Sequence, residues 1–237
     1  PRRDLHYTVI NAHYNTFGAK LLPQESLRGD KKVFHWHMEN IPEVLPEPDM
    51  APFSRTNPII MVSSFADWAE VYRWWSDLYR DKINIDENIQ KKVNALTSDK
   101  SSASEKARAI YNFCAQDIRY VAVEYGEAGH EPHRAADIFQ NKYGDCKDQA
   151  ILLIAMLRSA GIQAYPVLIG TYDYIGLPRA FPTLAFDHCI AAARIKDEWV
   201  FMDPTGETVS FGDLPAMDQN RLVLIFSDDT YTLLPTP

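Results

Sequence analysis

The sequence lacks the apolar runs and the cysteine spacing that mark several common classes of protein. It has no stretch of 18 or more apolar residues, so no membrane insertion is expected. Its three cysteines, Cys114, Cys146 and Cys189, cannot all pair with one another, so a monomer would carry at least one free thiol. No two of them form a CxxC pair, which excludes the common zinc and dithiol-redox motifs.

Basic residues are also few. The chain has 24 Lys and Arg residues against 32 Asp and Glu residues, which gives a net charge of −8. A nucleic-acid-binding surface needs clustered cations, so no nucleic-acid partner is expected. Because the sequence has neither a glycine-rich phosphate loop nor an alternating acidic calcium loop, it predicts no cofactor and no metal. His35 and His37 have no carboxylate or thiol at ligand spacing, and Pro132 lies between His130 and His133. Both histidine pairs are therefore weak candidates for a metal site.

The residues that are present indicate a globular α+β protein. Hydrophobic residues make up 46% of the 237, and charged residues 24%. The chain starts at Pro1 without an initiator Met or an apolar leader, so we interpret it as a piece of a longer protein. Residues 1–62 are predicted to form strands and turns, with a period of two at 33–38 and a proline-dense connector at 42–58. From Ser64 the apolar period becomes helical, with Ser64 and Asp67 resembling a capping box.

Further elements are predicted from the same signals. Helices are expected near 89–96, after a Ser102–Glu105 capping box, at 134–141 and from 146 to 157. Strands are expected at 4–10, 31–39, 59–62, 118–124, 164–170, 186–195, 198–202, 222–226 and 231–234. Long loops are expected at 126–133 and 171–182.

The segment from Tyr143 to Gly161 carries the strongest chemical signal. Asp145 is predicted to cap a helix whose residues 150–157 are apolar on every side, which is typical of a buried helix. Cys146 stands at the start of that helix, where the backbone amides and the helix dipole favour a thiolate. A thiolate is a nucleophile, and the same amides could hold the oxyanion formed when a carbonyl is attacked.

Two further residues complete a candidate constellation. His188 lies on the predicted strand 186–195 and could carry protons for Cys146. Asp203 ends the next strand, so antiparallel pairing across a two-residue turn would bring it close to His188 and let it fix the imidazole tautomer. Taken singly, each residue has a structural explanation, and we assign that explanation to Cys114 and Cys189 as buried small hydrophobes.

Several motifs resemble the core of bacterial transglutaminase-like proteins, in particular the type in which the core follows a domain of unknown function (DUF3857). The resemblance is carried by residues 143–148, by 150–153 with Gly161, by 186–188, and by 199–205. It implies a papain-like fold in which a helix bearing cysteine packs on an antiparallel sheet. It also implies a β-rich tail of the DUF3857-like module at 1–63 and a core domain at 64–237.

The resemblance further implies catalytic roles. Cys146 matches the nucleophile, His188 the base and Asp203 the orienting residue of a cysteine enzyme that acts on peptide or glutamine side-chain amides through an acyl-thioester. The expected outcome is hydrolysis by a peptidase or amidase, with transamidation as a further possibility, and the expected partner is a protein or peptide substrate. A periplasmic or cell-envelope location is implied by the resemblance only.

Some alternatives stay open from the sequence. The chain could be a non-catalytic peptide- or protein-binding scaffold of the same fold, or could transfer an acetyl group from a thioester cofactor. Relatives often carry Asn where this chain has Asp187, which is expected to point away from His188. Gln140, Tyr120 and Tyr125 are candidates for the second oxyanion donor. The oligomeric state is not determined by the sequence.

Overall fold

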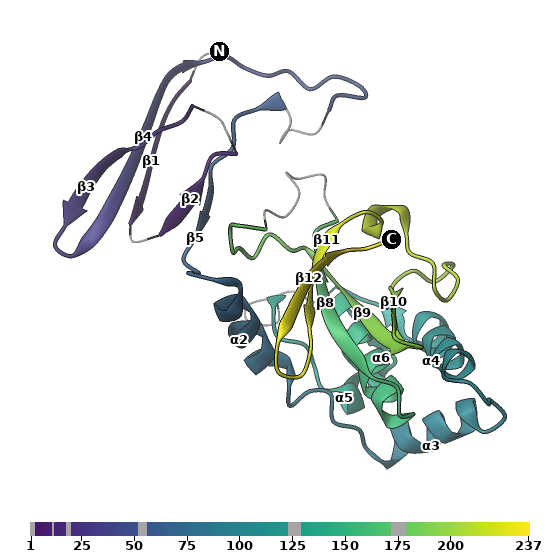
Figure 1. Cartoon of the computed structure of the whole chain (residues 1–237). Coiled ribbons are helices and arrows are strands. Elements are labelled where there is room, and N and C mark those ends of the chain that lie inside the picture. The colour runs from purple at the N-terminus through teal and green to yellow at the C-terminus, as the bar shows by residue number, and fades with distance from the viewer. Residues whose placement is uncertain (1–2, 11, 18–19, 52–55, 123–128, 172–178) are drawn as a thin grey trace. The chain divides into compact units, whose positions relative to one another are not determined.

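The computed structural model describes residues 3–10, 12–17, 20–51, 56–122, 129–171 and 179–237 (Figure 1). It consists of two compact units. One comprises Pro1–Val71 with Asp173–Leu184, and the other Tyr72–Tyr172 with Ala185–Pro237. The predicted α+β fold class, with a β-rich N-terminal region, is confirmed.

The first unit is built from short antiparallel sheets. The three-stranded sheet has the order β1 (Arg3–Ile10), β4 (Lys31–Ile41) and β3 (Gln24–Arg28), and β2 (His13–Asn15) pairs with β5 (Met61–Ser63). The predicted alternation in β4 is confirmed from Phe34 to His37, because Phe34 and Trp36 are buried with Val9 while His37 is exposed, but Val33 on the other face is also buried. Strand β3 was not predicted, since all five of its residues are exposed and carry no alternating apolar pattern.

The second unit has a five-stranded sheet in which every neighbouring pair is antiparallel. Its order is β10 (Glu198–Met202), β9 (His188–Ile195), β8 (Ala164–Ile169), β11 (Leu222–Phe226) and β12 (Tyr231–Pro235). Lys196 and Asp197 join β9 to β10 with φ values of 53° and 63°. Two consecutive positive φ values are typical of the tight hairpin turn whose twist matches that of the strands. The sheet therefore holds β9 and β10 in one register, which decides where the ends of these strands meet.

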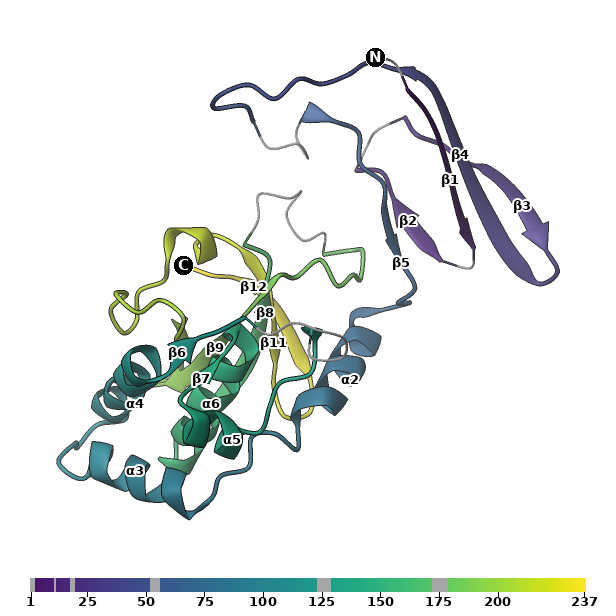
Figure 2. The same cartoon turned by 180° about the vertical axis from the view of Figure 1, so that it is seen from behind.

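Helices cover one face of this sheet (Figure 2). They are α3 (Glu87–Thr97), α4 (Ala103–Asp117), α5 (Ala135–Asn141) and α6 (Cys146–Ser159). Helix α2 (Trp68–Tyr79) begins in the first unit and ends in the second. Helix α6 contacts β8 and β9 and also α3, α4 and α5. Residues 146–157 of α6 are all buried, as the apolar run predicted. Gly161 follows α6 with a φ of 79°, which fits its predicted position after the helix end.

Two local predictions need correction. Helix α2 is capped by Asp67, whose Oδ1 accepts from Glu70 N at 2.8 Å, and not by Ser64. The predicted strand 118–124 is reduced to β6 (Arg119–Tyr120), which pairs in parallel with β7 (Tyr143–Gly144). Residues 123–124 of that prediction, residues 126–128 of the predicted loop 126–133 and residues 172–178 of the predicted loop 171–182 lie outside the described residues.

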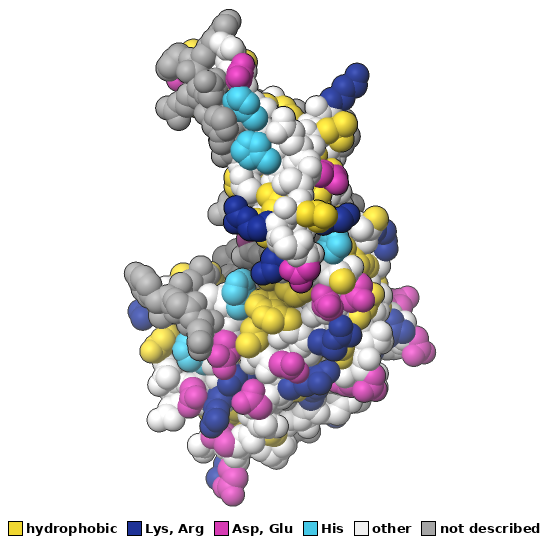
Figure 3. Space-filling view, turned by 90° about the vertical axis from the view of Figure 1, so that its left-hand side faces the viewer, with side chains coloured by type: hydrophobic (Ala, Val, Ile, Leu, Met, Phe, Trp, Pro, Cys, Tyr) yellow, Lys and Arg dark blue, Asp and Glu magenta, His cyan; other side chains and the backbone are white. Residues whose placement is uncertain are grey.

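Two features of the structure bear on membranes and on surface charge. None of the helices in the described part of the chain is long and apolar enough to cross a membrane. Figure 3 shows one face on which Asp and Glu side chains are mixed with Lys and Arg side chains.

Candidate active site

Cys146 is the first residue of α6. The N-cap is Asp145, whose Oδ1 accepts from Asp148 N at 3.3 Å, while the Asp148 carboxylate accepts in turn from Asp145 N at 3.3 Å. This reciprocal capping box satisfies two backbone donors. The N–H groups of Cys146 and Lys147 also lie in the first turn of the helix. N–H groups in a first turn have no carbonyl acceptor within the helix, because no helical residue stands four positions before them. The start of α6 therefore presents amide dipoles at Cys146.

The chain before Cys146 is held by specific contacts. Gly144 is required because a Cβ there would lie 2.5 Å from the Asp148 Cβ. Asp148 also accepts from His133 N at 2.8 Å and lies 3.0 Å from His133 Nδ1, which ties the segment after residue 129 to α6. The structural reason for Gly144 is thus the packing of a capping side chain.

A buried ion pair flanks the nucleophile candidate. Lys147 and Asp145 are 5% and 1% exposed, and the Lys147 ammonium contacts Asp145 Oδ2. Burial raises the pKa of Asp145, and the bond from Lys147 acts in the opposite direction. The pair neutralises a charge that would otherwise be buried alone.

His188 and Asp203 meet across the β9–β10 hairpin. The register pairs Met202 with Ala191, and its continuation puts Asp203 opposite Ile190, on the same sheet face as His188. His188 Nε2 lies 3.0 Å from Asp203 Oδ2, and the Asp203 side chain is 2% exposed. Pairing of the two strands therefore brings these side chains together, as the sequence predicted.

The turn after Asp203 fixes its carboxylate. Asp203 Oδ1 accepts from Thr205 N at 2.9 Å and from Thr205 Oγ1 at 2.8 Å. The buried Tyr111 hydroxyl donates to the backbone oxygens of Asp203, at 3.2 Å, and Val209, at 3.0 Å. Sequence reasoning missed Thr205 and Tyr111 as supports, although a Thr two residues after an Asp is a common turn signal.

Electrostatics at this site favour a protonated imidazole. Burial lowers the pKa of His188, but hydrogen bonds to Asp203 and Cys146 and the charges of both groups outweigh it and raise the pKa to about 10. Burial alone would raise the pKa of Asp203, whereas the bonds from His188 and Thr205 lower it. Because Nε2 is held by Asp203, Nδ1 is the ring nitrogen left for Cys146.

The other cysteines have different surroundings. Cys114 and Cys189 are 0% and 2% exposed, and burial raises the pKa of both thiols. Neither is disulfide-bonded. Asp187 bonds to Thr171, whose N donates to its Oδ1 at 2.7 Å and whose Oγ1 donates to its Oδ2 at 3.1 Å. These contacts agree with the expectation that Asp187 is directed away from His188.

The candidates for a second oxyanion donor lie in different places in the structure. Gln140 is an exposed residue of α5. Tyr120 is on β6 and lines a cavity of about 190 Å³ together with Gln149, Pro204 and Thr205. Tyr125 lies outside the described residues. Gln149, which sequence reasoning missed, is 1% exposed and donates through Nε2 to Ile118 O at 3.0 Å.

A third acidic residue lies beside the His188–Asp203 pair. Asp218, in the short helix η2 (Ala216–Asp218), is fully buried. Burial and the nearby charge of Asp203 raise the pKa of Asp218 to about 7. No sequence signal pointed to Asp218, because it lies in an irregular segment that the chain topology alone brings to the site.

These three side chains are close enough together to test as a metal-ligand set. One nitrogen or oxygen atom from each of His188, Asp203 and Asp218 lies within 4.8 Å of the others. However, His188 Nε2 and Asp203 Oδ2 are already hydrogen-bonded to each other. We therefore interpret the group as a hydrogen-bonded chain and assign no metal ligands.

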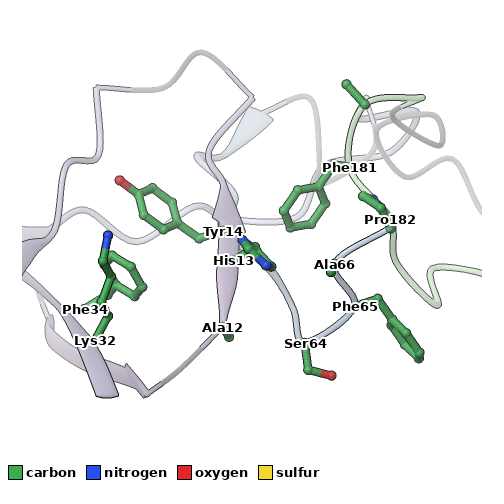
Figure 4. A pocket seen from close by; sticks show the side chains of 11 residues that line it. Ala12, His13, Tyr14, Lys32, Phe34, Ser64, Phe65, Ala66, Phe181 and Pro182 are labelled. Carbon is green, nitrogen blue, oxygen red and sulfur yellow. The ribbon is translucent and has the colours of Figure 1, made fainter. Parts of the chain in front are cut away.

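A separate cavity of about 620 Å³ lies within the first unit (Figure 4). Residues from β2 and β4 and from the segments 64–66 and 180–182 line it, among them His13, Tyr14 and Phe34. The rings of Tyr14 and Phe34 pack edge to face, with their centroids 5.1 Å apart. Cys146, His188 and Asp203 are not among its lining residues.

A family model matches the part of the chain that contains these residues. Residues 90–204 match the model of the transglutaminase-like superfamily core, a range that includes Cys146, His188 and Asp203. Residues 90–204 therefore resemble a transglutaminase-like core, as the sequence motifs indicated. No curated protein matches the sequence.

The solved structures that match the chain include bacterial and fish proteins. A candidate protease from Parabacteroides distasonis matches over 98% of this chain and 44% of its own, with a TM-score of 0.69 and 14% identity. A candidate cysteine protease from Cytophaga hutchinsonii matches over 86% of this chain and 65% of its own, with a TM-score of 0.44 and 14% identity. Red sea bream transglutaminase matches over 88% of this chain and 47% of its own, with a TM-score of 0.35 and 13% identity. The first match shows a shared fold, and this chain spans less than half of that protein.

Proposed function

We propose that the protein is a cysteine enzyme that cleaves amide bonds through an acyl-thioester. Cys146 is the nucleophile, His188 carries the proton and Asp203 orients His188. One observation carries this proposal. Three residues from α6, β9 and the end of β10 converge, with His188 Nε2 held by Asp203 and the other ring nitrogen left for Cys146.

The protonation of the pair supports the first step. A His188 pKa of about 10 keeps the imidazole protonated at neutral pH, which suits a thiolate–imidazolium pair. The thiolate attacks the amide carbonyl carbon, and a C–S bond forms. Collapse of the tetrahedral intermediate breaks the C–N bond, and the His188 proton goes to the departing amine.

The second step regenerates the thiol. Once Cys146 is acylated, its negative charge no longer favours an imidazolium, so His188 stays neutral after giving its proton to the amine. Neutral His188 then removes a proton from water or from an acceptor amine, which attacks the thioester carbonyl. The C–S bond breaks, and the Cys146 thiolate is again paired with protonated His188. Water gives a carboxylic acid, and an amine gives a new amide. Hydrolysis is the expected outcome because water is always available.

The backbone at the start of α6 suits the oxyanion. The N–H of Cys146 is in the first helical turn and is not consumed by the capping box, which uses Asp145 N and Asp148 N. This amide is our first oxyanion donor. Tyr120 is our candidate for the second, because it lines the small cavity shared with Thr205 beside the Asp203 turn.

We infer the substrate class from the likeness to the transglutaminase-like superfamily. Peptide bonds and glutamine side chains are the amides that we propose, in keeping with the candidate protease from Parabacteroides distasonis that shares the fold. We also propose that residues 1–63 are the tail of a DUF3857-type module and that residues 64–237 are the core domain.

The test is to trap the acyl-enzyme. The protein is incubated with a library of glutamine-containing and cell-wall-derived peptides and with an acylating probe, and adducts are located by mass spectrometry. We expect the adduct on Cys146 and none in Cys146→Ala. Cys114→Ala and Cys189→Ala are matched controls that should keep the adduct. Equal labelling of all three cysteines, or no labelling of the folded protein, would favour a non-catalytic scaffold.

A further inference from the structure

Asp218 is a buried acid that the proposed chemistry has not used. Its exposure is 0%, and neither Oδ1 nor Oδ2 has a hydrogen-bond partner among the described residues. One of its carboxyl oxygens lies within 4.8 Å of ligand atoms of both His188 and Asp203. Its backbone is anchored, because Asp218 O accepts from Thr236 Oγ1 at 2.5 Å. A buried carboxyl without a partner is unfavourable unless it carries a proton or serves a neighbour.

The neighbouring carboxylate has one acceptor position left. Among the residues that the structure describes, Asp203 Oδ1 receives both Thr205 donors, whereas Oδ2 receives only His188 Nε2. A carboxylate oxygen accepts about two hydrogen bonds, so Oδ2 retains a free lone pair. Two ionised carboxylates at this separation repel strongly inside a protein. A neutral carboxyl on Asp218 removes that repulsion and supplies a donor.

We propose that Asp218 is a positioning residue that keeps a proton on its carboxyl group and donates it as a hydrogen bond to Asp203. This inference rests on the proposed function, in which Asp203 must stay ionised and directed at His188. Asp218 stabilises the ionised form of Asp203 and restrains its carboxylate at Oδ2, the oxygen that does not accept from Thr205. The proton stays on Asp218, and no other proton is moved.

The surroundings of Asp218 favour the neutral form near neutral pH. The charged groups that face it are Asp203 at the end of β10, His188 on β9 and Arg221 ahead of β11. Burial, the largest effect, and the charge of Asp203 raise its pKa to about 7, while His188 and Arg221 act in the opposite direction. Exposed carboxyl groups have a much lower pKa, of about 4, and so are already ionised at pH 7.

The direct test is infrared spectroscopy of the whole chain. At pH 5.5 to 6 the spectrum of the unaltered protein should contain the carbonyl band of a neutral carboxylic acid, and this band should fade with a midpoint near pH 7. The band should be absent from Asp218→Asn and present in Asp213→Asn, an exposed control five residues away. A missing band in the unaltered protein would overturn the inference, whether or not the variants fold.

The functional test separates a hydrogen-bond donor from a filler of space. Asn at position 218 can still donate to Asp203, whereas Ala cannot. At pH 6, alkylation of Cys146 by iodoacetamide should slow by about tenfold in Asp218→Ala and by less than about threefold in Asp218→Asn. Equal rates in both variants and the unaltered protein would refute the positioning role. A Cys146 that reacts no faster than a free thiol would instead refute the proposed function, while the infrared band still decides the state of Asp218.

Discussion

Replacement of Asp203 by Asn tests the proposed division of roles with almost no change of shape. An Asn oxygen can still accept from Thr205 N and Thr205 Oγ1, so the turn after β10 is preserved. The amide nitrogen takes the place of Oδ2 and donates to His188 Nε2. The imidazole must then carry its proton on Nδ1, the nitrogen left for Cys146, and a protonated Nδ1 cannot accept the thiol proton.

The size of the effect follows from the electrostatics of His188. A pKa of about 10, against the ordinary 6.5, corresponds to about 5 kcal/mol in favour of the imidazolium at about 1.4 kcal/mol per pKa unit. The hydrogen bond to Asp203 is the largest of the causes that raise this pKa. Without it, burial lowers the pKa, so the imidazolium is lost at neutral pH. We expect Cys146 alkylation and any amidase activity to fall by about 10³- to 10⁴-fold.

The same substitution changes how stability depends on pH. His188 has a raised folded-state pKa, so its stabilising contribution is complete below about pH 6.5 and is lost as the pH rises towards 10. Urea unfolding at pH 6 and pH 9 should show this decline in the unaltered protein and a smaller one in Asp203→Asn. Asp213→Asn is the exposed control. A folded Asp203→Asn variant whose Cys146 reacts at the original rate at pH 7 would refute the reasoning.

Three further predictions concern stability. Gly144→Ala should lower the free energy of unfolding by about 1–3 kcal/mol in urea, because the new Cβ meets the Asp148 side chain at 2.5 Å; an unchanged midpoint would contradict this packing. Ser102→Ala should cost about 1 kcal/mol through loss of the α4 capping box, and the loss of helicity is followed by circular dichroism. Asp218→Asn should stabilise the protein by up to about 4 kcal/mol at pH 8 but little at pH 4. The folded Asp218 keeps its proton between about pH 4 and 7 while the unfolded chain releases it, so a pH-independent difference in thermal midpoint would count against a raised pKa.

Much of the core could be predicted because local signals agreed with tertiary packing. Helix α6 combines an N-cap at Asp145, an apolar run and a terminal Gly161, and each feature favours the same helix. The β9–β10 hairpin follows from two apolar strands around Lys196–Asp197, and its register brings His188 towards Asp203. By contrast, β3 carries no burial pattern, and the helix starting at Trp68 is capped later than its first polar residues indicate.

The sequence by itself determined the helices and most strands of the core, the antiparallel hairpin and the identity of Cys146, His188 and Asp203 as candidates, because periodicity, capping and turn chemistry are local properties. Only the tertiary structure decided what surrounds those residues. Tyr111 reaches the Asp203 backbone from α4, and Asp218 reaches the His188–Asp203 pair from η2. Such contacts join residues far apart in the chain, and the protonation of a buried carboxyl depends on which charges and how much solvent the folded protein leaves around it.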